Sequence, residues 1–131
     1  MNYSTGQVSI DLKAIKNNYL FLRKLCAPAE VAATVKASSY GLGGENKIVE
    51  TLEKVKCKKF FVANIVEALK IRKKFKSITI FVLNGLNKGE EKTFFSNNIT
   101  PVLNNYNQFE RWTSYIKVNF NRPLMLHVDT G

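Results

Sequence analysis

Short apolar runs alternate with amphipathic stretches along the 131-residue chain, and this alternation restricts the possible folds more than any other feature. A run of about four to eight apolar residues is typical of a buried strand, whereas apolar residues spaced three and four apart lie on one face of a helix. Strands that alternate with helices pair in parallel, because each helix returns the chain to the same end of the sheet. We therefore predict an α/β protein with a parallel sheet.

The number of predicted strands narrows the layout. After the first helix we expect about five strands, which fits either an open doubly wound sheet or a partial (β/α)8 barrel of TIM type, whose complete form takes about 250 residues. The expected strands are 8–11, 31–35, 60–63, 78–83, 99–103 (short or irregular because of Pro101) and 124–128. The expected helices are 12–25, 47–55, 65–75, 88–95 and 106–116, with a loop at Gly41, Gly43 and Gly44.

Basic residues dominate the charge, which is +10 at pH 7. Such a charge suits a nucleic-acid partner, but it also arises from a lysine-rich, solvated surface. Sixteen lysines against four arginines favour the solvated surface, because sites that bind phosphates and bases prefer the planar guanidinium. Two basic runs, 54–59 and 72–76, end predicted helices, where cations complement the negative C-terminus. We therefore expect no nucleic-acid partner.

Other residues exclude further classes of protein. Cys26 and Cys57 are too few for a disulfide framework, and we expect both to be reduced thiols. His127 is the single histidine, and no cluster of histidine, cysteine or carboxylate residues has metal-ligand spacing, so we expect no metal. We find neither a signal peptide nor an apolar run of about twenty residues, so we expect a cytoplasmic protein without membrane contact.

The segment from Ala32 to Gly43 carries the candidate chemistry. Lys36 directly follows a predicted buried strand, and side chains at the C-terminal ends of barrel strands point into the active-site mouth. Partial desolvation there favours the neutral amine, which is the nucleophile for Schiff-base chemistry with an aldehyde cofactor. Tyr40 follows four residues later, and its phenol can donate a hydrogen bond to a phosphate oxygen. From the residues alone, Lys36 is one candidate among sixteen lysines.

Within this segment, Val35–Gly43 resembles the signature of the alanine racemase family, usually written V-K-A-N-A-Y-G-H-G. Five further segments resemble family motifs in the same order along the chain. They are Val8–Leu12 with Asn17 and Asn18 (the opening strand and first helix), Phe61–Leu69 (F-x-V-A-x-x-x-E-A-x), Ile80–Gly85 (I-L-V-L-x-G), Thr100–Val102 (T-P-V) and Leu126–Gly131 (K-x-D-T-G). Six matches in order are more specific than any one of them.

The resemblance implies a homodimeric enzyme that interconverts L-alanine and D-alanine with pyridoxal 5'-phosphate, supplying D-alanine for cell-wall peptidoglycan. It implies an N-terminal α/β barrel followed by a C-terminal β domain. Lys36 would bind the cofactor as a Schiff base and, once the substrate has displaced it, would move the proton on one face of Cα. Tyr40 would contact the cofactor near its phosphate. In this family, a tyrosine from the partner subunit's C-terminal domain serves the other face.

Among the departures from the family pattern, two residues and the extent of the chain matter most. Leu42 stands where the signature has histidine, and His127 stands where the later motif has lysine. Because the pattern continues beyond Gly131, we expect residues 1–131 to be the N-terminal part of the cofactor-binding barrel domain, truncated after about five barrel strands, with the C-terminal β domain absent. We expect this part alone to be inactive, and either to associate through its exposed strand edges or to need a complementary C-terminal fragment.

Three functions stay open from the sequence. The first is a fragment of an alanine racemase. The second is a non-catalytic protein that binds pyridoxal phosphate for storage or delivery. The third is a basic nucleic-acid-binding module, which would bind DNA or RNA with a steep dependence on salt but which no recognised motif supports.

Overall fold

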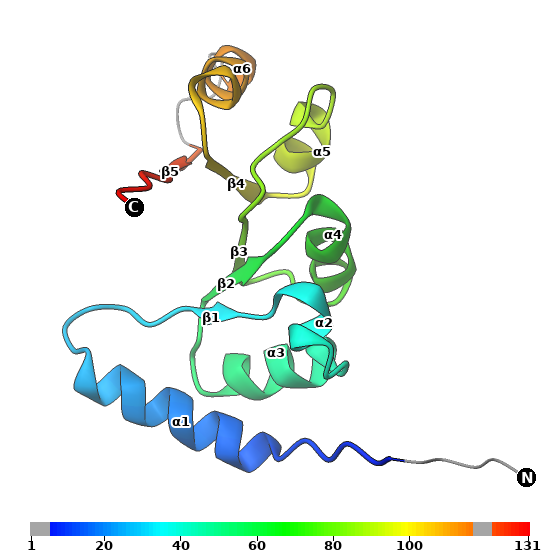
Figure 1. The fold of residues 1–131 in the computed structure, drawn as a ribbon, viewed down its shortest axis with the longest axis vertical. Helices are drawn as coiled ribbons and strands as arrows, with labels where there is room; N and C mark the ends of the chain where they lie inside the picture. The colour runs from blue at the N-terminus through cyan, green and yellow to red at the C-terminus, as the bar shows by residue number, and fades with distance from the viewer. Residues whose placement is uncertain (1–5, 117–121) are drawn as a thin grey trace, which may run out of the picture.

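The computed structural model describes residues 6–116 and 122–131 of the chain. Within these ranges, five parallel strands form one sheet. In the order in which they pair, they are β1 (Ala33–Thr34), β2 (Lys59–Val62), β3 (Thr79–Val82), β4 (Ile99–Leu103) and β5 (Met125–Leu126). The order of the strands in the sheet therefore follows their order in the chain, as in a (β/α)8 barrel. In a doubly wound sheet, by contrast, the order of the strands reverses at a switch point. The helices follow one another along one side of the sheet (Figure 1). The predicted α/β class and partial barrel are confirmed.

Most predicted elements are present with small shifts in their bounds. The helix at 12–25, the strand at 99–103 and the helix at 106–116 have the predicted bounds. The helices are α1 (Leu12–Leu25), α2 (Lys36–Tyr40), α3 (Glu45–Lys54), α4 (Ile65–Lys74), α5 (Glu91–Ser96) and α6 (Tyr106–Ile116). In these described ranges, no helix is long and apolar enough to cross a lipid bilayer.

Two predictions about strands are wrong: the strand at residues 8–11 and the irregularity of the strand that contains Pro101. Residues 8–11 form no strand and pair with none of the described strands. Their apolar spacing suits a strand, but a strand forms only where a neighbouring strand exchanges backbone hydrogen bonds with it. Asp11 instead begins α1, where its carboxylate accepts hydrogen bonds from the N–H groups of Lys13 and Ala14 at 2.8 and 3.0 Å. β4 is regular despite Pro101, which pairs with Val82.

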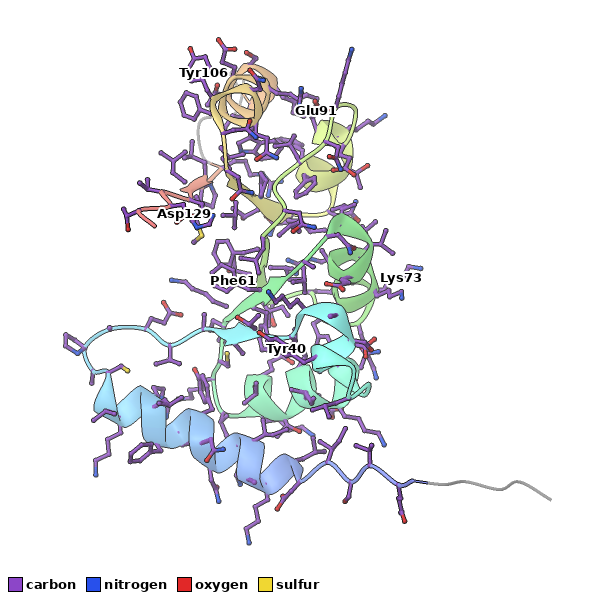
Figure 2. The ribbon with its side chains drawn as sticks, viewed as in Figure 1. Tyr40, Phe61, Lys73, Glu91, Tyr106 and Asp129 are labelled. Atoms are coloured by element: carbon purple, nitrogen blue, oxygen red, sulfur yellow. The ribbon has the colours of Figure 1, made fainter. Side chains whose placement is uncertain are left out.

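The main hydrophobic core lies between the helices and the side of the sheet that they cover. On β2, Phe60 and Val62 are fully buried in this core, whereas Phe61 between them points away from the helices (Figure 2). We call the side that carries Phe61 the inner face. Phe61 pairs in register with Phe81 of β3, and the two rings stack with centroids 4.8 Å apart. The inner face is thus the side of the sheet that would line the inside of a closed barrel.

A buried tyrosine on α1 makes the free energy of unfolding depend on pH in the alkaline range. Tyr19 is 7% exposed and donates a hydrogen bond to the carbonyl of Val31 at 3.4 Å. Burial, together with a hydrogen bond to Cys57, raises the pKa of Tyr19 from 10.0 to about 12. Burial also raises the pKa of the Cys57 thiol. The fold therefore favours the neutral forms of both groups.

We expect the free energy of unfolding to fall as the pH rises from about 10 to about 12, because the unfolded chain releases the tyrosine proton first. Below the unfolded pKa this contribution is fully present. Urea unfolding of the wild type and of Tyr19→Phe at several pH values measures the slope. The variant should lose part of the pH dependence, whatever its stability at neutral pH. Equal slopes in the two proteins would contradict the assignment to Tyr19.

Candidate functional site

Lys36 lies at the C-terminal end of β1, where it is the first residue of α2. It comes two positions after Thr34, which pairs in register with Phe61, so the alternation of side chains directs Lys36 to the inner face. Val35 between them is buried in the core on the other side. Lys36 is half-buried, and it forms no ion pair with any residue that the structure describes. Its amine is therefore available on the inner face.

The backbone after Lys36, which makes up the rest of α2, forms a left-handed turn rather than a regular α-helix. Residues 37–40 have φ values between 51° and 59°, and none of them is glycine. Side chains of L-residues clash in this conformation, at a cost of roughly 1–2 kcal/mol per residue. Two backbone hydrogen bonds close the turn, from Ser39 N–H to the Val35 carbonyl at 3.1 Å and from Gly41 N–H to the Ala37 carbonyl at 2.8 Å. The sequence predicted a glycine loop only from Gly41 onward, so this turn was missed.

The turn brings the two predicted site residues together. Lys36 Nζ lies 6.0 Å from the centroid of the Tyr40 ring, and Tyr40 is exposed. The amine can form a covalent bond with an aldehyde, and the phenol beside it can donate a hydrogen bond to an anionic group. This pair fits a cofactor that carries both an aldehyde and a phosphate, as pyridoxal phosphate does. Leu42, the departure from the family signature, is exposed just beyond the turn.

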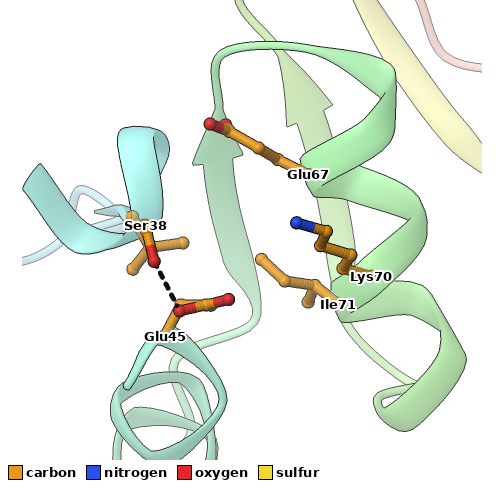
Figure 3. Close-up of a pocket in the computed structure, with 6 residues that line it drawn as sticks. Ser38, Glu45, Glu67, Lys70 and Ile71 are labelled. Carbon is orange, nitrogen blue, oxygen red and sulfur yellow. Dashed lines mark hydrogen bonds between the residues drawn. The ribbon is translucent and has the colours of Figure 1, made fainter. Parts of the chain in front are cut away.

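One carboxylate on α4 holds the ends of β1 and β2 together. Glu67 accepts a hydrogen bond from Ala37 N–H at Oε1 (2.9 Å) and another from Ala63 N–H at Oε2 (2.7 Å). Asn64 caps α4 and accepts from Glu67 N–H at 3.1 Å, which fixes the backbone of Glu67. Figure 3 shows the Glu67 side chain reaching from α4 toward the end of the strand. No role for Glu67 was predicted, although it is the acidic residue of the F-x-V-A-x-x-x-E-A-x motif.

A small pocket lies behind the turn, between it, α3 and α4 (Figure 3). Its lining includes Val35 and Ile71 of the core, which lies on the other side of the sheet from the inner face. Its volume is about 80 Å³, well below the several hundred Å³ typical of cofactor sites. Ser38 Oγ donates to Glu45 Oε2 at 2.9 Å there, and the backbone N–H of Glu45 and the Ser38 hydroxyl lower the pKa of that carboxyl. The pocket is lined by Val35, Ser38, Glu45, Glu67, Lys70 and Ile71. It supports the turn, and the candidate cofactor site is the inner face above β1.

His127, the second departure from the family pattern, is tied to the end of β4. The Asn104 side-chain amide donates to the carbonyls of Leu83 (2.8 Å) and Val102 (3.1 Å), which leaves its oxygen as the acceptor. That oxygen lies 2.8 Å from His127 Nδ1. In the neutral ring, Nδ1 therefore carries the hydrogen, and Nε2 is an acceptor. His127 and Lys36 follow β5 and β1, the two outer strands of the described sheet.

Comparisons with known proteins show which family the chain resembles. Residues 10–131 match the family described as alanine racemase, N-terminal domain. The chain is 38% identical over 130 residues to the catabolic alanine racemase of Agrobacterium fabrum, covering 98% of the chain and 33% of that protein. It is 42% identical over 126 residues to the alanine racemase of Rickettsia prowazekii, and this match covers 95% of the chain and 31% of that protein.

A solved structure is similar over the same region. The crystal structure of alanine racemase from Bartonella henselae, with covalently bound pyridoxal phosphate, matches with a TM-score of 0.86 and 36% identity. The match covers 93% of this chain and 34% of that one. The chain thus spans about a third of the length of the relatives it matches.

Proposed function

This chain belongs to the family of alanine racemase N-terminal domains, and we propose that it forms the cofactor-binding part of an enzyme that interconverts L-alanine and D-alanine. The observation that carries the proposal is the Lys36 amine, which lies on the inner face at the end of β1, without an ion pair among the described residues and beside Tyr40. We propose D-alanine for cell-wall peptidoglycan as the product, and the cytoplasm as the compartment.

Lys36 has two tasks in this proposal. Its ε-nitrogen holds pyridoxal phosphate by a covalent bond to the aldehyde carbon, and Tyr40 donates a hydrogen bond to a phosphate oxygen. When bound, pyridoxal phosphate withdraws electrons from the Cα of the amino acid and so makes its proton labile. Lys36, as a free amine, would take or return this proton on one face of Cα. The alternation along β1 holds the amine on the inner face for this role.

Racemisation also needs an acid–base group on the opposite face of Cα. We propose that this group comes from the part of the racemase that corresponds to the other two thirds of the relatives' length. That part can be joined to this chain or supplied as a complementary fragment, and we propose a homodimer as the working assembly. In this scheme, residues 1–131 bind the cofactor but do not racemise alanine alone.

A trapping experiment tests the role of Lys36. The chain is incubated with pyridoxal 5'-phosphate, reduced with borohydride and mapped by peptide mass spectrometry. We expect the label to be concentrated on Lys36, because Tyr40 beside it can donate a hydrogen bond to the phosphate. The exposed Lys73 of α4 (Figure 2) serves as the comparison. A label spread evenly over the lysines, or absent from Lys36 after the missing part has been supplied, would overturn the proposal.

A non-catalytic carrier of pyridoxal phosphate is the second candidate, because Lys36 and Tyr40 lie side by side and can hold the cofactor by themselves. A carrier needs Lys36 and Tyr40 but no second acid–base group. Adding the remaining part of a relative's barrel and β domain separates the two candidates. Conversion of L-alanine to D-alanine in the reconstituted protein supports the racemase, whereas cofactor binding without conversion supports the carrier.

A further inference from the structure

The Glu67 carboxylate joins two strand ends that are far apart in the sequence, and one of them carries Lys36. Its two oxygens accept hydrogen bonds from Ala37 N–H and Ala63 N–H at 2.9 and 2.7 Å. Both bonds have a charged acceptor, and such bonds are about twice as strong as those between neutral groups. Glu67 is half-buried, which limits competition by water for the same oxygens.

The bond to Ala37 acts directly on the backbone of Lys36. The Ala37 N–H belongs to the peptide plane that also contains the Lys36 carbonyl, so its direction sets the ψ angle of Lys36. Rotation of this plane would swing the turn, and Tyr40 with it, relative to β1 and the Lys36 side chain. A hydrogen bond that fixes this plane therefore keeps Tyr40 beside the amine.

The backbone around Lys36 needs such a restraint. Residues 37–40 are held in the left-handed region, which costs free energy at each position. The backbone bonds from Ser39 and Gly41 close the turn on itself, but they do not anchor it to another element. Glu67 supplies an anchor from α4, and its own position is set by the Asn64 cap. The turn is thus tied to the first turn of α4, which the Asn64 cap holds in place.

We propose that Glu67 is a positioning residue for Lys36: it fixes the Lys36–Ala37 peptide plane and so keeps Tyr40 beside the Lys36 amine, where the two groups can bind an aldehyde that carries a phosphate. This inference rests on the proposed function, because it concerns the same lysine. Glu67 touches neither substrate nor cofactor in this role. It acts through the backbone of the turn.

The test compares labelling at two lysines of one molecule, which separates positioning from general loss of structure. Pyridoxal 5'-phosphate and borohydride are applied to the full chain, and the ratio of label on Lys36 to label on the exposed Lys73 is measured. We expect Glu67→Ala to lower this ratio about tenfold, because both charge-assisted bonds are lost. Glu67→Gln should lower it less, since the amide oxygen can still accept one bond. Circular dichroism monitors the fold of each variant.

A matched control and a second measurement complete the design. Glu50→Gln makes the same change in charge as Glu67→Gln, at a side chain that is 45% exposed and pairs with Lys54 at 2.8 Å, so its ratio should equal that of the wild type. Hydrogen exchange of the wild type should show the Ala37 amide protected, and Glu67→Ala should lose this protection.

The results distinguish failure of the proposed role of Glu67 from failure of the proposed function of Lys36. An unchanged labelling ratio in a folded Glu67→Ala variant would overturn the role of Glu67. So would an unprotected Ala37 amide in the wild type, even if Glu67→Ala does not fold. A wild-type ratio near one with a protected Ala37 amide would instead overturn the proposed function of Lys36.

Discussion

Replacing Lys36 with alanine is expected to abolish covalent labelling by pyridoxal phosphate and borohydride at this position, and to remove the absorbance band that the bound cofactor adds. The amine is the group that reacts with the aldehyde, and alanine has no nucleophile to replace it. In a protein that also contains the remaining part of the racemase, conversion of L-alanine to D-alanine should fall by about 10³-fold or more, because a proton-transfer group is lost together with the covalent attachment. Absorbance, peptide mapping and a D-alanine assay measure the three effects.

Two other variants control for loss of charge and for loss of any lysine. Lys36→Arg keeps a cation at the end of β1, but the guanidinium stays protonated and is not a nucleophile at neutral pH, so this variant should fail like Lys36→Ala. Lys73→Ala removes an exposed lysine of α4 and should keep wild-type labelling of Lys36. Racemisation by Lys36→Ala at the wild-type rate would refute the proposed chemistry.

The second large effect concerns the core that supports the site. Phe60→Ala is expected to lower the free energy of unfolding by about 3–5 kcal/mol, because a large side chain is removed from a packed interior and leaves a cavity. Phe60 is 0% exposed, and its β2 backbone pairs with Ala33 of β1 and Ile80 of β3. Typical domains are stable by about 5–15 kcal/mol, so this loss removes a large share of the total.

Urea unfolding followed by circular dichroism, at matched protein concentration, measures the loss. Phe21→Ala is the matched control, because Phe21 on α1 is 66% exposed and its removal should change the free energy of unfolding by no more than about 0.5 kcal/mol. A cost for Phe60→Ala equal to that of Phe21→Ala would show that the face of the sheet under the helices is not the core.

The candidate site was only partly predictable. Lys36 and Tyr40 were identified because both lie in one short segment that resembles a family signature, and the structure places them beside each other. Glu67 lies thirty residues beyond Ala37, and the motif around it does not reveal what its carboxylate contacts. The left-handed turn was missed because its four residues include no glycine, the residue that usually indicates this conformation.

The sequence by itself determined the local elements and the class of the fold. Apolar spacing predicted α6 and β4 with their observed bounds, since periodicity depends only on neighbouring residues. The tertiary structure decided which backbone groups found partners. Residues 8–11 have strand-like apolar spacing but no neighbouring strand among the described residues, so they stay irregular. The same reason applies to the site: the amide after Lys36 is held by a carboxylate on α4, and only folding brings these two groups within hydrogen-bonding distance.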